Sequence, residues 1–283
     1  MVSILKLMLL ALGLLVVLTA VVAHAFFRID MREAHRAWAD FVAPEKAAGP
    51  FDPEMLVNLP EPARRYLTYS ILRGTPLKMS VQLHMKGTFA LGDRKSHRVM
   101  TMEARQMLSP PRGFVWIPEM GSGMVRIWGS DGYAGDKAWT RFWVWGLIPV
   151  ARLSSTGDLA LSAAGRSIME AIWAPASLLP QNGARWAAVG DDAARVTFEV
   201  EGEPLTLSLT LSEEGRPLTV SMMRWSNANP EGIFRWQSFG GTIEETGEFG
   251  GYVIPTRVEV GNHYGTGDYF PFFRVRIVDA RYR

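Results

Sequence analysis

Cysteine is absent from this chain of 283 residues. Its absence excludes a disulfide framework, cysteine-ligated zinc, an iron–sulfur cluster and a cysteine nucleophile. Long basic runs are missing too, because 30 Lys and Arg stand against 28 Asp and Glu and leave a net charge of +2. The basic surface that is typical of a nucleic-acid-binding protein is therefore not expected, and we predict no nucleic-acid partner.

Sequence motifs of catalysis are also scarce. Gly265-Thr266-Gly267 lacks the third glycine and the following helix of a dinucleotide fingerprint. Neither a Walker-type phosphate loop nor a Gly-x-Ser-x-Gly elbow occurs. No two of the five histidines are separated by two to four residues, the spacings that hold a metal. We therefore expect no metal and no cofactor, and a protein without enzymatic activity is favoured over an enzyme.

One long apolar run stands at the N-terminus. Residues 7–27 contain no Asp, Glu, Lys or Arg, and as a helix they would extend about 32 Å, enough to cross a bilayer core. This length favours a retained transmembrane anchor over residues 1–28. Ala23-His24-Ala25 fits a cleavage pattern, so a cleaved signal segment stays open as the alternative.

The charges that flank this run bear on its orientation. Lys6 precedes it, and three arginines follow it: Arg28, Arg32 and Arg36. By the positive-inside rule this balance favours a cytoplasmic body. The resemblance given below implies the opposite orientation, with the chain crossing the inner (cytoplasmic) membrane once and its body on the periplasmic side. We adopt the periplasmic expectation.

Residues 29–50 are expected to form a helical and loop linker, and residues 51–283 a single β-rich domain. A helix is predicted over residues 62–72, because Pro62 suits a first turn and Gly74 suits a helix end. Beyond it the apolar period changes from about four residues to two, which is typical of strands with one buried face.

The alternation is clearest in residues 81–91 and 205–212. Asp131-Gly132, between two extended segments, predicts a hairpin turn. A helical insert is predicted over residues 162–173, where apolar side chains recur at helical spacing. Many antiparallel strands must bury their apolar faces together. We therefore expect a mainly β (α+β) fold, with one curved antiparallel sheet or open half-barrel packed on helices and preceded by an N-terminal transmembrane helix.

Three stretches carry a resemblance to a known family. They are Gly113-Phe114-Val115-Trp116 with 130–133, residues 162–166 continuing through 170–180, and Phe239-Gly240-Gly241 with 250–255. Over residues 55–280 the chain resembles an uncharacterised bacterial family of membrane-anchored proteins, a domain of unknown function. That family implies a cell-envelope location but no activity.

A second resemblance concerns the order of elements. Residues 109–114 are followed by a Ser-Asp-Gly segment, a helical insert, and strands joined at Glu-Gly and Gly-Tyr-x-Ile-Pro turns. This order is similar to that of the LolA-like periplasmic lipoprotein carrier superfamily. The resemblance implies an open half-barrel closed by helices around an apolar, lipid-binding cavity. The chain has no lipoprotein cysteine, which excludes a lipid-modified anchor.

Aromatic residues, including ten tryptophans, provide the main candidates for a ligand site. Alternation along one predicted strand places Trp139 and Trp143 on one face and Phe142 on the other, so both faces are apolar. Such side chains line an apolar groove, rest at a bilayer interface or simply fill a core. The ligand-binding candidates are Trp116, Trp128, Tyr133, Trp139, Trp143, Trp145, Trp173 and Met169.

Three further residues are alternative acid–base candidates: Glu170, His263 and Asp268. Glu170 lies four residues after Arg166, so it forms either an ordinary ion pair on the helix surface or a buried carboxylate. His263 and Asp268 share a glycine-rich segment, which is either a polar turn or an acid–base pair.

Together these observations favour a membrane-anchored protein of the bacterial envelope that binds or transfers a lipid or another apolar molecule. The membrane contact is made by residues 7–27, and protein partners are not indicated. Two alternatives stay open. One is a hydrolase-like enzyme of the envelope that uses the acid–base candidates, and the other is a structural scaffold of an envelope complex whose interior is filled by its own side chains.

Overall fold

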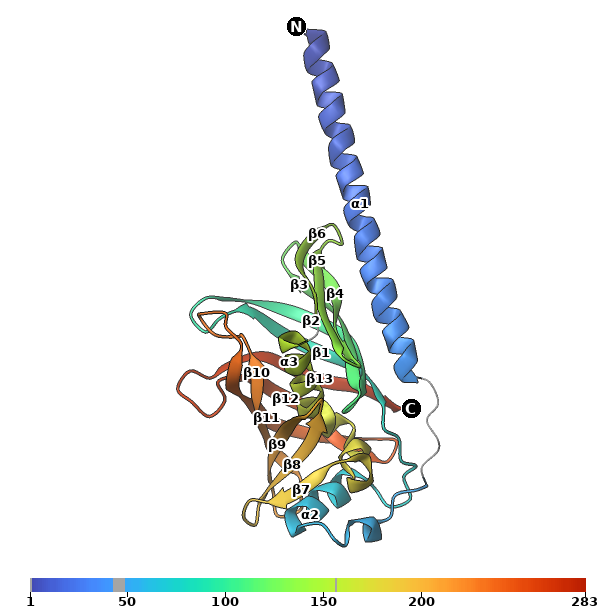
Figure 1. The fold of residues 1–283 in the computed structure, drawn as a ribbon, viewed down its shortest axis with the longest axis vertical. Helices are drawn as coiled ribbons and strands as arrows, with labels where there is room; N and C mark the ends of the chain where they lie inside the picture. The colour runs from blue at the N-terminus through green and yellow to red at the C-terminus, as the bar shows by residue number, and fades with distance from the viewer. Residues whose placement is uncertain (1, 43–48, 156) are drawn as a thin grey trace.

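A computed structural model describes residues 2–42, 49–155 and 157–283. Thirteen strands in these ranges form one antiparallel sheet (Figure 1), which confirms the expected mainly β fold. The strands are β1 (Val81–Gly92), β2 (His97–Ser109), β3 (Gly113–Ser122), β4 (Val125–Ala134), β5 (Lys137–Val144), β6 (Ile148–Ser155), β7 (Arg185–Ala188), β8 (Ala193–Val200), β9 (Glu203–Leu211), β10 (Pro217–Ser226), β11 (Arg235–Phe249), β12 (Tyr252–Asn262) and β13 (Phe270–Tyr282).

The two halves of the sheet meet at its centre because the first strand pairs with the last. From this pair, β2 to β6 follow one another to one edge, and β12 to β7 follow in reverse order to the other. Phe89 of β1 lies opposite Phe273 of β13. Among the described residues the edge strands β6 and β7 are not paired with each other, so the sheet is open.

Period-two alternation accounts for the faces of the strands. In β9, Leu205, Leu207 and Leu209 are buried, whereas Thr206 and Ser208 between them are partly exposed. Successive side chains of a strand point to opposite faces, so a shift of one residue in register would expose all three leucines. The leucine face therefore fixes the register and lies on the concave, core side of the sheet.

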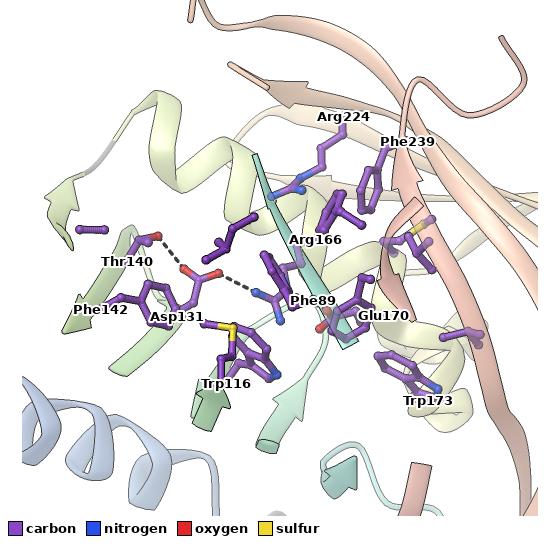
Figure 2. A pocket seen from close by; sticks show the side chains of 18 of the residues that line it. Phe89, Trp116, Asp131, Thr140, Phe142, Arg166, Glu170, Trp173, Arg224 and Phe239 are labelled. Atoms are coloured by element: carbon purple, nitrogen blue, oxygen red, sulfur yellow. Dashed lines mark hydrogen bonds and ion pairs between the residues drawn. The ribbon is translucent and has the colours of Figure 1, made fainter. Parts of the chain in front are cut away.

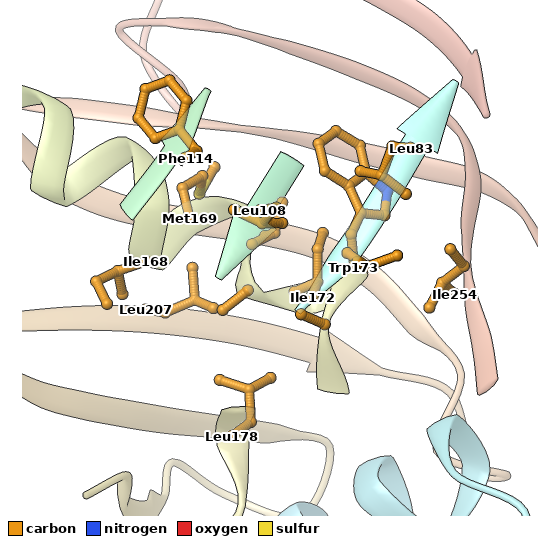
Figure 3. Close-up of a cluster of buried hydrophobic side chains, with 14 of the residues drawn as sticks. Leu83, Leu108, Phe114, Ile168, Met169, Ile172, Trp173, Leu178, Leu207 and Ile254 are labelled. Carbon is orange, nitrogen blue, oxygen red and sulfur yellow. The ribbon is translucent and has the colours of Figure 1, made fainter. Parts of the chain in front are cut away.

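A helical insert between β6 and β7 covers the concave face. It consists of α3 (Asp158–Met169) and the 3-10 helix η2 (Glu170–Trp173), which confirms the helix predicted over residues 162–173. The insert contacts β3 to β6 of one half and β9 and β10 of the other. Figure 3 shows Ile168 and Ile172 of this insert among core side chains of the strands.

Short helices close one end of the sheet. They are η1 (Pro53–Leu56), α2 (Glu61–Ser70), η3 (Pro175–Leu178) and η4 (Pro180–Asn182). The predicted helix over residues 62–72 corresponds to α2, which has Pro62 in its first turn. Its buried face includes Tyr66 and Leu67, and it packs near β7, β8 and β12.

Helix α1 (Val2–Val42) is one continuous helix of 41 residues that extends away from the sheet (Figure 1). By length and composition it can cross a membrane, and none of its most apolar window is buried against the rest of the chain. Near its C-terminal end, Ala34 and Phe41 are buried against the convex face of the sheet.

The predicted boundary between the anchor (1–28) and the linker (29–50) falls inside this helix. The first part of the predicted linker is therefore helical and packed on the domain. Residue 1 and residues 43–48, which belong to these two predicted segments, lie outside the described residues. The division of the chain into an anchor, a linker and one β domain stays a prediction.

Asp131-Gly132, predicted as a hairpin turn, lies inside the continuous strand β4 instead. The turn before β4 uses Gly123, which has a φ of +60°. Gly132 pairs with Trp139 of β5, and a Cβ atom at this glycine would lie 2.2 Å from the indole Cζ2. The glycine is needed because the indole lies across the strand, not because the chain turns there.

Candidate functional site

A cavity of about 520 Å³ lies on the concave face of the sheet beside α3 (Figure 2). Its walls come from β1, β3 to β6, β10 to β13, α3 and η2. Because strands from both halves of the sheet contribute, the cavity depends on the central pairing of β1 with β13. Its volume is within the range of small-molecule sites, about 300–1,000 Å³.

The cavity walls are mostly aromatic and aliphatic. The Trp116 ring lies 6.1 Å from that of Phe89 and 6.2 Å from that of Phe142, between centroids. At one end, Leu91 and Val150 line the cavity and are 37% and 55% exposed. These two residues mark its mouth, where apolar side chains meet water.

A small polar cluster interrupts the apolar wall. Arg166 of α3 forms ion pairs with Asp131 at 2.6 Å and with Glu170 at 2.7 Å. The Thr140 hydroxyl donates to the other oxygen of Asp131 at 2.7 Å. Burial alone would lower the pKa of Arg166, but the two carboxylates outweigh burial and hold this pKa above its ordinary value. The guanidinium therefore stays charged and paired.

Glu170 is held from two sides. Arg166 Nε donates to one carboxylate oxygen, and the buried Gln106 Nε2 donates to the other. The helical Arg–Glu pair expected from the sequence is thus formed, but it faces the interior instead of the solvent. Both oxygens of this carboxylate therefore accept hydrogen bonds from the protein.

A second arginine on the cavity wall has no carboxylate partner among the residues that the structure describes. Arg224 of β10 donates to the Ser162 carbonyl oxygen at 3.0 Å and to the Ser162 hydroxyl at 3.3 Å. Its guanidinium carbon lies 5.0 Å from the centroid of the Phe239 ring. Figure 2 shows both arginines among the side chains that line the cavity.

Three of the eight ligand-binding candidates line this cavity: Trp116, Trp173 and Met169. All three are nearly buried by the protein itself. Trp173 is also fixed by a hydrogen bond from its Nε1 to the Pro255 carbonyl oxygen, at 2.9 Å. The cavity therefore lies beside three well-buried side chains, and their part in ligand binding stays a prediction.

Three more candidates, Trp128, Trp139 and Trp143, lie on the opposite face of the sheet and pack near α1. The Trp143 ring meets the Phe27 ring edge-on, with centroids 6.2 Å apart. Trp139 packs in a separate apolar cluster with Phe41. Trp128 lines a depression beside Phe27. Strand alternation correctly separated this face from that of Phe142, which lines the cavity.

The two remaining candidates lie apart from the cavity. Tyr133 is buried, which raises its pKa to about 12, with Glu201 adding to the effect. Trp145 is 48% exposed at the turn between β5 and β6 and has a φ of +52°. Its Nε1 donates to the Met124 carbonyl oxygen at 3.0 Å.

Of the three acid–base candidates, only Glu170 lines the cavity. His263 and Asp268 lie on the loop between β12 and β13. Asp268 forms an exposed ion pair with Arg94 at 2.9 Å, and the His263 backbone N–H donates to the Ser238 carbonyl oxygen at 2.7 Å. Within the described ranges, no group of three or more histidine, aspartate or glutamate side chains is arranged to hold a metal.

Phenylalanines form much of the cavity wall and were not among the candidates. Phe89, Phe239, Phe272 and Phe273 all line it, and the rings of Phe89 and Phe272 lie 5.4 Å apart between centroids. Alternation predicts an inward side chain at Phe239, but it would place the consecutive residues Phe272 and Phe273 on opposite faces, and both line the cavity beside a register irregularity between β12 and β13. These phenylalanines converge because β1 pairs with β13. That pairing joins the two ends of the domain, so it cannot be read from the pattern of neighbouring residues.

Helix α1 is fixed to the sheet through one buried carboxylate. Asp30 accepts hydrogen bonds from Trp143 Nε1 at 3.1 Å, Arg152 Nε at 3.0 Å and Arg152 Nη2 at 3.1 Å. The side chain of Asp30 is only 3% exposed. An aspartate on the predicted linker thus joins α1 to β5 and β6, and the interaction raises the pKa of Arg152.

Replacing Asp30 by alanine is expected to release this part of α1. Hydrogen bonds to charged groups contribute about 1.5–3 kcal/mol, so residues 29–42 should exchange their amide hydrogens faster. The measurement is hydrogen–deuterium exchange on the full chain in detergent. Asp40→Ala, an exposed position on the same helix, is the matched control. Equal exchange in the two variants would show that Asp30 does not hold the helix.

Comparison with known proteins now identifies the family. The sequence profile of DUF6544, a family of unknown function, matches residues 49–275. The chain belongs to this family. The resemblance to an uncharacterised family, expected over residues 55–280, is confirmed. Comparison with curated proteins finds no match.

Three solved structures are distantly similar to this DUF6544 member. A LolA superfamily protein from Nitrosomonas europaea is 12% identical, with 78% of this chain and 92% of that chain covered and a TM-score of 0.39. A domain described as an outer membrane lipoprotein-sorting protein, from Vibrio parahaemolyticus, is 10% identical, with coverage of 72% and 85% and a TM-score of 0.38. A DUF1329 family protein from Desulfovibrio piger is 8% identical, with coverage of 72% and 86% and a TM-score of 0.40. The distant similarity to LolA-like proteins is thereby confirmed.

Proposed function

We propose that this DUF6544 member is a single-pass membrane protein whose β domain binds a lipid or another apolar molecule in the cavity beside α3. The observation that carries the proposal is the cavity of about 520 Å³ with mainly aromatic and aliphatic walls. Burial of apolar ligand surface there would contribute about 25 cal/mol per Å², before the free-energy cost of association. A scaffold filled by its own side chains has no need of such a space.

The anchor in this proposal is the apolar part of α1, residues 7–27, in the inner membrane of a bacterial envelope. The domain then lies on the periplasmic side, as the sequence resemblance implies. The end of α1 that follows residues 7–27 is docked on the domain. Phe27, Asp30, Ala34 and Phe41 all contact the sheet, so the helix that leaves the membrane is part of the folded protein.

The hairpin of β5 and β6 supports a position of the domain against the bilayer surface. A Cβ atom at Gly146 in its turn would lie 3.2 Å from the Phe27 ring, so the turn lies where the apolar run of α1 ends. Beside it, Trp145 and Ile148 are 48% and 53% exposed. Tryptophan is favoured at membrane–water interfaces, and Val150 of β6 belongs to the mouth of the cavity.

Binding is favoured over catalysis by the state of Glu170. It is the acid–base candidate that reaches the cavity, and both of its oxygens accept hydrogen bonds from the protein, from Arg166 and Gln106. A general acid or base needs an oxygen directed at the substrate. Glu170 instead fixes Arg166 in the wall.

The test is to purify the full chain in an uncharged detergent and analyse it by native mass spectrometry, before and after organic extraction. We expect a bound apolar molecule that extraction removes, and a change in tryptophan fluorescence when the extracted protein is titrated with lipid. Absence of both a co-purifying molecule and a fluorescence change would contradict the proposal.

A further inference from the structure

Arg224 is a cationic side chain on an otherwise mostly apolar wall. It lines the cavity together with Val220 of the same strand and Phe239 of β11. Its hydrogen bonds to the Ser162 carbonyl and hydroxyl oxygens orient the guanidinium without neutralising it. Arg224 therefore lies where the apolar wall of Val220 and Phe239 meets the polar groups carried by α3.

The two carboxylates of the cavity are both engaged elsewhere. Asp131 and Glu170 pair with Arg166 at 2.6 and 2.7 Å. In the part of the chain that the structure describes, no carboxylate lies within ion-pair distance of Arg224. The cavity thus contains one arginine with two carboxylate partners and one arginine with none.

This arrangement disfavours the charged form of the Arg224 guanidinium. Burial, followed by repulsion from Arg166, lowers the pKa of Arg224 to about 10, and the weaker attraction of Asp131 and Glu170 does not restore it. The guanidinium is still charged at neutral pH. Arg224 is partly buried, and a charge removed in part from water without a counter-ion is costly, so binding of an anion at this position would be favourable.

We propose that the molecule bound in the cavity is an amphiphile with an anionic group, a carboxylate or a phosphate, that pairs with Arg224 while its apolar chain lies among the aromatic side chains. This inference rests on the proposed function and narrows the class of ligand. A guanidinium matches both oxyanions bidentately, so the shared chemistry is an oxyanion joined to an apolar chain. A fatty acid and a phospholipid are its two sources.

The test compares three probes of equal chain length: decanoate, decyl phosphate and decanol. The full chain is kept in an uncharged detergent without phosphate at neutral pH, and binding is followed by tryptophan fluorescence, since Trp116 and Trp173 line the cavity. We expect at least one anionic probe to bind about tenfold more tightly than decanol. The anionic probe that binds more tightly identifies the headgroup class.

The variant Arg224→Gln keeps hydrogen-bond donors for Ser162 and removes the charge. The affinity of this variant for the anionic probes should fall to about its affinity for decanol. Its affinity for decanol should stay within about twofold of that of the native chain. Unchanged decanol binding also shows that the variant is folded. Arg224→Lys should retain part of the preference for anionic probes over decanol. Arg195→Gln, at an exposed position on β8, is the matched control and should retain the whole preference.

Two results would overturn the inference, and they differ from failure of the proposed function. Equal affinities for decanol and both anionic probes would show that the cavity binds apolar chains without recognising an anion. A preference for anionic probes that persists in Arg224→Gln would assign the recognition to another residue. If none of the three probes binds, the proposed function itself is contradicted and the inference falls with it.

Discussion

Replacing Arg166 by methionine is expected to lower the free energy of unfolding by about 3–5 kcal/mol, the range found when one partner of a buried ion pair is removed. The side chain of Arg166 is 14% exposed, and its partners Glu170 and Asp131 are 11% and 23% exposed. Methionine fills much of the same space but leaves both carboxylates without a counter-ion. Chemical denaturation followed by circular dichroism measures the loss.

The control for Arg166 is a pair with the same spacing on the surface. Arg235 and Glu231 are also four residues apart and form an ion pair at 3.0 Å, with both side chains more than half exposed. Arg235→Met should change stability by less than about 1 kcal/mol. Adding Glu170→Gln and Asp131→Asn to Arg166→Met should recover most of the loss. Equal losses at Arg166 and Arg235 would contradict the assignment of a buried network.

Replacing Val260 by aspartate is expected to weaken binding of an apolar ligand about tenfold or more. Val260 of β12 lines the cavity and is only partly buried, so the domain should accept the change. A carboxylate at this place would have to lose water when the ligand enters, and that desolvation opposes binding. Tryptophan fluorescence titration of the full chain with decanol measures the affinity.

Two variants make this result interpretable. Val260→Ala removes apolar surface without adding charge, and its affinity should fall only a few-fold. Val278→Asp adds the same charge at a position of β13 that is 40% exposed and outside the cavity, and it should bind like the native chain. If Val260→Asp binds decanol as the native chain does, the ligand does not occupy this cavity.

Strand alternation and helical spacing predicted most of the architecture. The period of two in residues 205–212 and the apolar positions of the insert at 162–173 both reflect contacts with the nearest neighbours in the chain, and both elements are present as β9 and α3. The Asp131-Gly132 prediction was wrong for a physical reason. Glycine serves equally for a turn and for close approach of a neighbouring side chain, and only the pairing of Gly132 with Trp139 shows which applies.

The tryptophans show where local pattern stops being informative. Alternation separated Trp139 and Trp143 from Phe142, but it could not tell which face of β5 is concave. That is decided by α1, which packs against the tryptophan face from a segment expected to be a linker. Arg224 was missed because a single arginine in an alternating strand resembles any solvated position. Only the convergence of β10 with α3 places it beside Arg166.

Helix α1 passes from its apolar run to its docked end without a break over 41 residues, about 60 Å. In the proposed arrangement, with residues 7–27 held in a membrane, a continuous helix would keep the domain at a fixed height and tilt, so it would not swing outward like a module on a flexible tether. A soluble carrier escorts its cargo by diffusing between two compartments. The proposed domain would instead be a stationary receptacle, with its ligand delivered and collected at one place.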